Sequence, residues 1–185
     1  PLRHHGGYTA AAYPAQVTLT DAPGEYPMAE QYLTLANKTD QAFRTLVEYL
    51  EGFDEPTIVI MFGDHQPSVE QGFLDRAYGV TQDQMTMEQY MGKYCVPFVI
   101  WANYPLPEEG PEVTSLNFLG QYVLRYAGLQ GNGYDSFLWQ LQTRLPAITF
   151  VGYVDRTGKA YSHLATTEFT ACIEDYSRIQ AKHRF

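Results

Sequence analysis

The residues with the clearest chemical potential are Asp64 and His65, which stand side by side after Gly63. A carboxylate oxygen and a neutral imidazole nitrogen are ligands that suit Mn²⁺ or Zn²⁺. Adjacent side chains diverge along a strand, but a loop that starts at a glycine and is stiffened by Pro67 can turn both toward one ion. The alternative is that Asp64 caps a turn and His65 lies on the surface. The pair is therefore a candidate for part of a metal site.

A second candidate site lies near the start of the chain, in the run His4-His5-Gly6-Gly7-Tyr8. Two glycines allow the backbone to approach a ligand closely. A histidine beside them can contact a phosphate group or act as a general acid. The alternative is that the paired histidines belong to a tag or to a chain end without a role.

The elements that must position these residues follow from the hydrophobic pattern. Continuous apolar, β-branched runs predict two strands buried on both faces, at residues 57–62 and 96–101. Apolar residues at three- and four-residue spacing predict helices. The expected helices cover residues 29–51, 115–126, 135–144 and 166–185, and a hairpin is expected at 150–161.

The alternation of helices and strands predicts one α/β domain over residues 1–185, with a central parallel or mixed sheet flanked by helices. In open α/β sheets, ligands bind beyond the carboxyl ends of the strands. Asp64 and His65 directly follow the first predicted strand, which favours the functional interpretation of the pair.

Composition narrows the function classes. Of the 185 residues, 45% are hydrophobic and 18% charged, which is typical of a globular chain. The net charge of −9 argues against nucleic acid as a partner. No apolar run approaches the roughly 18 residues that cross a bilayer, and no signal peptide is recognisable. The missing initial methionine predicts a piece of a longer protein. The two cysteines, Cys95 and Cys172, leave a disulfide open.

Several segments together resemble a known family, in the order in which that family has them. They are His5-Gly6-Gly7-Tyr8 and the runs at residues 29–33, 40–43, 57–67 and 96–103. They resemble the C-terminal part of the catalytic domain of lipoteichoic acid synthase-like phosphoglycerol transferases, in the sulfatase and alkaline phosphatase superfamily. The resemblance runs from residue 4 to residue 155, and residues 156–185 match nothing in it.

The resemblance implies an alkaline phosphatase/sulfatase-like fold on the extracellular face of the bacterial cell membrane, anchored by transmembrane helices upstream of this chain. It implies one divalent ion, Mn²⁺ or else Zn²⁺ or Mg²⁺, with Asp64 and His65 matching an Asp-His pair of metal ligands. His5 matches a histidine of the phosphate site, although the family commonly has asparagine where this chain has His4.

The chemistry that the resemblance implies is transfer of glycerol phosphate from phosphatidylglycerol to a glycolipid or polymer acceptor. In the family a threonine attacks the phosphodiester and releases diacylglycerol. That threonine and the first metal carboxylate correspond to positions upstream of Pro1, so the chain by itself is expected to be inactive. Two alternatives stay open. One is a phosphatase, phosphonate hydrolase or sulfatase of the same superfamily, and the other is a non-catalytic module that binds carbohydrate or protein.

Overall fold

The computed structural model describes residues 7–8, 14–107 and 110–182. The chain divides into two compact units. Unit 1 comprises Pro1–Gln89 and Lys93–Pro105, and unit 2 comprises Tyr90–Gly92 and Leu106–Phe185. The single domain expected from the sequence stays a prediction.

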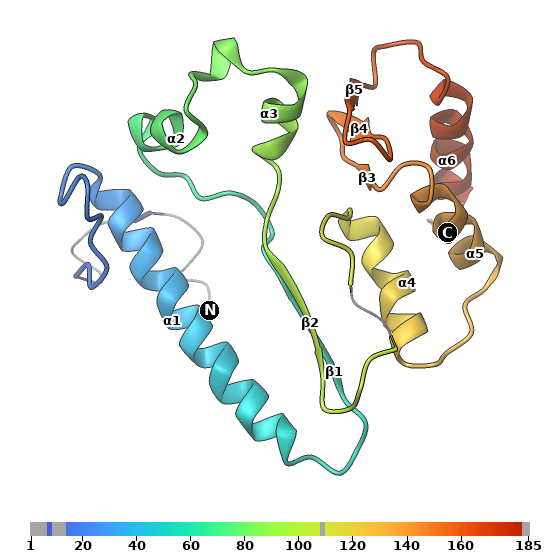
Figure 1. Cartoon of the computed structure of the whole chain (residues 1–185), viewed down its shortest axis with the longest axis horizontal. Helices are drawn as coiled ribbons and strands as arrows, with labels where there is room; N and C mark the ends of the chain where they lie inside the picture. The colour runs from blue at the N-terminus through green and yellow to red at the C-terminus, as the bar shows by residue number, and fades with distance from the viewer. Residues whose placement is uncertain (1–6, 9–13, 108–109, 183–185) are drawn as a thin grey trace. The chain divides into compact units, whose positions relative to one another are not determined.

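Unit 1 is built on one long helix and a two-stranded sheet (Figure 1). Its elements are α1 (Pro27–Glu51), β1 (Ile58–Phe62), α2 (Gln71–Tyr78), the short 3-10 helix η2 (Gln82–Gln84) and β2 (Phe98–Ala102). Helix α3 (Met87–Gly92) begins in unit 1, and its last three residues belong to unit 2. Helix α1 ends at Gly52, as predicted. The strands are half-buried rather than buried on both faces, and Phe62 is 46% exposed.

Strands β1 and β2 pair antiparallel, with Ile58 opposite Ala102 and Phe62 opposite Phe98. This corrects the expected parallel or mixed sheet. The alternation of helix and strand does not fix strand direction, and the connection through α2, η2 and α3 brings the chain back into β2 beside the end of β1. As a result, the residues that follow β1 lie next to those that precede β2.

Helix α1 forms hydrogen bonds with the described part of the chain that precedes it. The Thr34 hydroxyl accepts hydrogen bonds from the backbone N–H groups of Gln16 (2.9 Å) and Val17 (3.0 Å). The buried Glu30 carboxylate accepts from the N–H groups of Leu19 (2.9 Å) and Gly24 (3.0 Å). These hydrogen bonds hold the pKa of Glu30 below its ordinary value.

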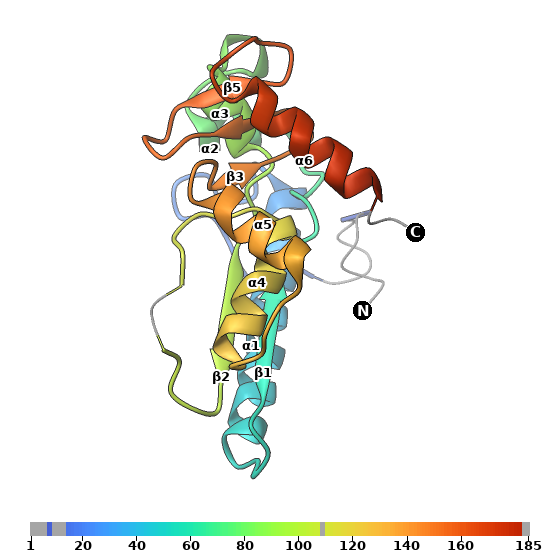
Figure 2. The same cartoon turned by 90° about the vertical axis from the view of Figure 1, so that its right-hand side faces the viewer.

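Unit 2 packs helices against a small antiparallel sheet (Figure 2). Its elements are α4 (Leu116–Tyr126), α5 (Gly133–Gln142), β3 (Ala147–Ile148), β4 (Gly152–Val154), β5 (Ala160–Ser162) and α6 (Thr170–Lys182). Its core is formed by buried side chains from all of these parts except β5, namely Phe118, Leu138, Leu141, Leu145, Ile148, Tyr153 and Tyr176. The predicted hairpin is β4–β5, with Gly158 in its turn at φ +84°.

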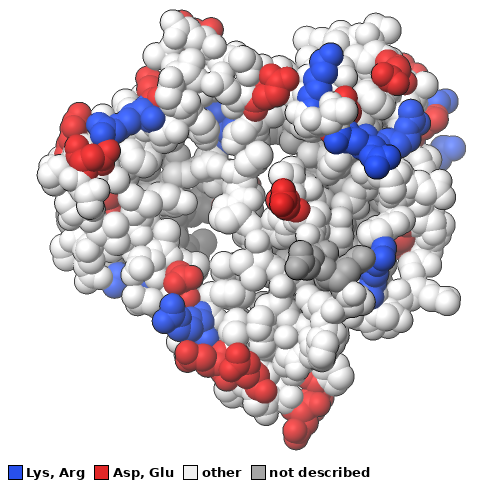
Figure 3. All heavy atoms as spheres, viewed as in Figure 1, with Lys and Arg blue, Asp and Glu red and all other residues white. Residues whose placement is uncertain are grey.

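Two small antiparallel sheets thus replace the expected central mixed sheet within the residues that the structure describes. The chain remains a mixed α/β fold. No helix in the described ranges is both long and apolar enough to span a bilayer. Neither Cys95 nor Cys172 forms a disulfide. On the face drawn in Figure 3, acidic and basic side chains lie in small groups.

Candidate metal centre

The loop that carries Asp64 and His65 leaves β1 in close contact with the segment before β2. The Gly63 N–H donates to the Pro97 carbonyl at 3.1 Å. A Cβ atom at Gly63 would lie only 2.9 Å from the Cβ of Val96, which is shorter than real carbon contacts. Glycine is therefore required at residue 63 because the two backbones approach each other, and the loop begins from a fixed point.

The structure brings one atom of each candidate ligand together. His65 Nε2 lies 3.6 Å from Asp64 Oδ2, and the two side chains are 58% and 65% exposed, respectively. Two ligand atoms that are each about 2.1 Å from one ion lie about 3.0–3.4 Å apart. The observed separation is close to that range, so a small rotation of either side chain lets both bind one cation. The Asp64 Oδ1 atom meanwhile accepts from the His65 backbone N–H at 2.9 Å.

The hydrogen bond of the other imidazole nitrogen determines which ring nitrogen of His65 can bind a metal. His65 Nδ1 lies 2.8 Å from the Gln66 carbonyl oxygen. A carbonyl can only accept, so Nδ1 must carry the proton, and in the neutral ring Nε2 then holds a lone pair. Metal-binding histidines commonly donate their second ring N–H to a backbone carbonyl in this way. The donor atoms and their orientation fit a divalent cation.

Two contacts anchor the loop beyond the pair. The Gln66 side-chain amide donates to the Cys95 carbonyl, in the segment before β2. The Glu70 carboxylate accepts from the N–H groups of Met28 (2.7 Å) and Ala29 (3.0 Å), in the first turn of α1. Glu70 thus caps a helix that begins 43 positions earlier in the chain. Both ends of the loop are held by backbone groups of other elements.

Tyr8 connects this loop with the glycine-rich segment near the start of the chain. Its ring is buried and meets the Tyr32 ring edge-on, with centroids 5.8 Å apart. Burial raises the pKa of Tyr8, with smaller contributions from Tyr32 and from the negative charge of Asp64. Tyr8 therefore lies within electrostatic reach of Asp64. His5, the candidate phosphate contact, lies outside the described residues.

Sequence reasoning selected Asp64 and His65 but assigned no role to Gln66 and missed Glu70. One sequence signal could have indicated the Glu70 cap. Helix α1 begins with Pro27 after Tyr26, which has no side-chain oxygen suited to capping, so its first N–H groups need an acceptor from elsewhere. Across the described ranges, no three His, Cys, Asp or Glu side chains gather closely enough to hold a metal. Asp64 and His65 fit two ligands of a site that needs more.

Comparison with known proteins gives two matches. Residues 1–129 match the family model described as Sulfatase. A protein of Rhizobium meliloti (strain 1021) named "Putative cyclic beta-1,2-glucan modification protein" is 24% identical over 188 residues. The similarity covers 97% of this chain and 29% of that protein, so the chain spans less than a third of its curated relative. No solved structure gives a significant match.

Proposed function

The chain belongs to the sulfatase family, and from this premise we propose that it is part of a metal-dependent phosphoglycerol transferase that modifies a glucan. The observation that carries the proposal is the 3.6 Å separation of Asp64 Oδ2 and His65 Nε2, with Nδ1 of the same ring bound to a backbone carbonyl. Family membership implies an enzyme superfamily that typically uses divalent metals.

In the proposed site, Asp64 contributes a charged oxygen and His65 a neutral nitrogen, and the remaining ligands come from residues outside this chain. Mn²⁺ is the proposed ion, and a divalent ion there would polarise a phosphoryl oxygen of the substrate. Gln66 holds the imidazole orientation through its carbonyl, and Glu70 holds the loop against α1. His5 is proposed to contact the phosphate.

The proposed donor is phosphatidylglycerol. Transfer breaks the P–O bond to the diacylglycerol oxygen, which leaves with a proton, and forms a P–O bond to an acceptor hydroxyl. The relative is named for cyclic β-1,2-glucan modification, and this favours a glucan over a lipoteichoic acid polymer as the acceptor. Location at the extracellular face of the membrane, through helices outside this chain, is part of the same proposal.

The test uses the natural protein that contains this sequence, with phosphatidylglycerol radiolabelled in its headgroup and cyclic β-1,2-glucan as acceptor. We expect Mn²⁺-dependent release of diacylglycerol and label on the glucan. Asp64→Asn and His65→Gln should each lower the rate by at least about 100-fold, since each removes a metal ligand worth several kcal/mol in the transition state. The matched control Asp54→Asn, in the exposed turn after α1, should retain the wild-type rate.

Other outcomes identify the alternatives. Release of glycerol phosphate to water without transfer would indicate a phosphodiesterase. Turnover of phosphate monoesters would indicate a phosphatase, and turnover of sulfate esters would indicate a sulfatase. If Asp64→Asn keeps full activity, the proposed role of the pair is wrong. A natural protein with no turnover of any of these esters would favour the binding module.

A further inference from the structure

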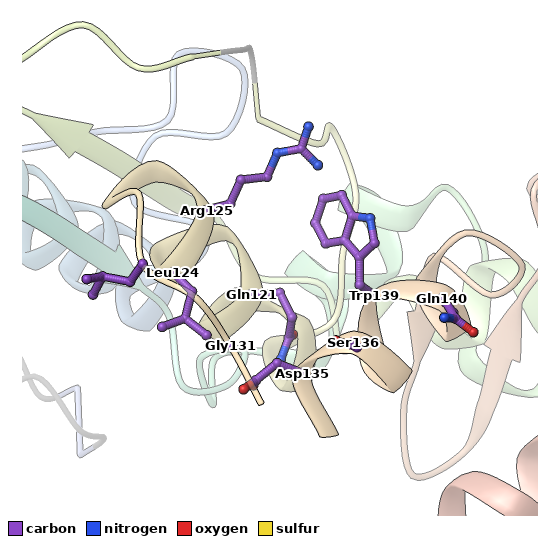
Figure 4. Close-up of a pocket in the computed structure, with 9 residues that line it drawn as sticks. Gln121, Leu124, Arg125, Gly131, Asp135, Ser136, Trp139 and Gln140 are labelled. Atoms are coloured by element: carbon purple, nitrogen blue, oxygen red, sulfur yellow. The ribbon is translucent and has the colours of Figure 1, made fainter. Parts of the chain in front are cut away.

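A hollow lies between helices α4 and α5, entirely within unit 2 (Figure 4). Its volume of about 370 Å³ is at the lower end of the range of about 300–1,000 Å³ that small-molecule sites occupy. Helix α4 contributes Gln121 and Arg125, and α5 contributes Asp135, Trp139 and Gln140. The lining therefore combines one large aromatic ring with planar polar groups.

Trp139 gives the hollow a rigid apolar surface. The Arg125 guanidinium carbon lies 4.6 Å from the centre of the Trp139 ring, and the Tyr122 ring meets it edge-on at a centroid distance of 5.6 Å. A half-exposed indole held in this way suits the apolar C–H face of a pyranose ring, since both are flat and poorly hydrated. The exposed Arg125 side chain can move off the indole and donate to the hydroxyls of a sugar.

The polar wall of the hollow is fixed before any ligand arrives. The Gln121 amide donates to Asp135 Oδ1 at 3.3 Å, and Asp135 Oδ2 accepts from the Asn132 N–H at 2.7 Å in the capping box of α5. Gln121 is only 7% exposed, and its Oε1 has no hydrogen-bond partner among the described residues. Because the amide nitrogen faces a carboxylate, the oxygen is the atom left without a donor. This oxygen is itself buried, so a ligand hydroxyl reaches it only when the Gln121 side chain turns toward the hollow.

The charge of the lining selects among ligand classes. The lining residues include one cation, Arg125, and one carboxylate, Asp135. Their charges balance, so the hollow has no excess positive charge to attract an anionic lipid headgroup or a polyanion. Neutral groups that both donate and accept, such as sugar hydroxyls, match this mixture.

The comparisons point in the same direction. The family match ends at residue 129, before α5, whereas the similarity to the glucan modification protein covers 97% of the chain. The α5 wall therefore lies in the part that this chain shares with that relative and not with the family model. We propose that the hollow between α4 and α5 binds the glucan acceptor, with Trp139 as the stacking surface and Gln121, Arg125, Asp135 and Gln140 as hydroxyl partners. This rests on the proposed function for the identity of the ligand.

The test measures binding without turnover, by fluorescence titration of the full 185-residue chain with cyclic β-1,2-glucan. The sequence has two tryptophans, so a Trp101→Phe background leaves Trp139 as the reporter. We expect a saturable change in emission. Calorimetry with the same glucan should show at least a tenfold loss of affinity in Trp139→Ala and a severalfold loss in Arg125→Ala. The control Phe150→Ala removes an aromatic side chain that is 76% exposed in the same unit, and it should bind like the wild type.

Arg125→Ala provides a second test in case Trp139→Ala misfolds, because loss of an exposed arginine side chain should leave the fold intact. Circular dichroism checks the fold of each variant. Absence of glucan binding to the wild type, or equal binding by both variants and the wild type, overturns the proposal. Tighter binding to phosphatidylglycerol vesicles than to the glucan also overturns it. Trp139-dependent binding without any Asp64-dependent diacylglycerol release supports this site and counts only against the proposed transferase. Asp64-dependent release of diacylglycerol without glucan binding supports the proposed transferase and counts against this site.

Discussion

At the scale of single residues, Gly63 at the loop start has no room for a side chain unless its neighbour Val96 shifts. The contact of 2.9 Å that a Cβ would make with Val96 is with a branched side chain next to the backbone, which cannot turn away. We expect Gly63→Ala to lower the free energy of unfolding by about 1–3 kcal/mol, as overpacking does. Gly52→Ala is the control, since its Cβ would meet only the Tyr49 carbonyl at 3.8 Å. Urea unfolding would give both values, and equal stability of the two variants would contradict the close contact.

Asp155 makes unit 2 sensitive to acid. Its carboxylate accepts from the Thr157 hydroxyl (2.7 Å) and N–H (2.8 Å), from the Lys159 N–H (3.2 Å) and from the Tyr161 hydroxyl (2.9 Å). These hydrogen bonds, led by the one from the Thr157 side chain, lower the pKa of Asp155 from 3.8 to about 2. The charged form is thus favoured by folding, and its contribution is present above pH 4 and lost as the pH falls toward 2.

The corresponding prediction concerns Asp155→Asn, whose amide group cannot accept from all of these donors. We expect this variant to melt at a lower temperature than the wild type at pH 7, and the difference to shrink as the pH falls from about 4 to about 2. Thermal unfolding followed by circular dichroism at several pH values measures it. Glu174→Gln, on an exposed position of α6, is the control and should show no such narrowing difference. A constant difference across the range would mean that the Asp155 charge is not the cause.

At the scale of elements, the cap on α1 joins the helix to the loop of the candidate metal site. Glu70 supplies acceptors for two N–H groups that would otherwise lack them, and its negative charge lies at the positive end of the helix. We expect Glu70→Ala to cost about 0.5–2 kcal/mol of stability. Glu70→Gln should cost less, because one acceptor oxygen remains. Denaturant unfolding measures the loss, with Glu48→Ala as a surface control. Equal free energies of unfolding for Glu70→Ala and Glu48→Ala would contradict the role of Glu70 as a cap.

The position of most helices and strands could be predicted from the sequence, because the apolar spacing of each segment is a local property. The helix expected at 29–51 is α1, and the strand expected at 57–62 is β1. Strand direction and the small size of the sheets could not be predicted, since they depend on how the connection between β1 and β2 folds. At the site, the types of Asp64 and His65 were informative, but the cap from Glu70 requires a contact across 41 positions that no local pattern records.

At the scale of the whole molecule, charge is divided unequally between the units. Unit 1 has five basic and thirteen acidic residues, a net charge of −8, and unit 2 has seven basic and eight acidic, a net charge of −1. The candidate metal ligands are in the acidic unit, where a divalent cation is attracted and an anionic substrate is repelled until the cation is bound. The hollow with Trp139 lies in the nearly neutral unit, which suits an uncharged ligand.

We expect the chain by itself to be inactive. Within the described residues only Asp64 and His65 are candidate ligands, too few for a metal site, and the resemblance implies a nucleophile that corresponds to none of the residues in this chain. We expect no turnover of bis-p-nitrophenyl phosphate by the 185-residue chain with Mn²⁺, and only weak Mn²⁺ binding by calorimetry. Hydrolysis that is lost in Asp64→Ala and kept in Asp83→Ala would contradict this, because it would mean that this chain completes a catalytic centre.

The cysteines have a practical consequence. Cys95 belongs to unit 1 and Cys172 to unit 2, and no bridge joins them. Each unit therefore contains one thiol for a maleimide dye, with Cys95 the more accessible. Energy transfer between a donor on one and an acceptor on the other would act as a ruler for the arrangement of the two units. The same labelled molecule, titrated with Mn²⁺ or with glucan, would report whether either ligand draws them together.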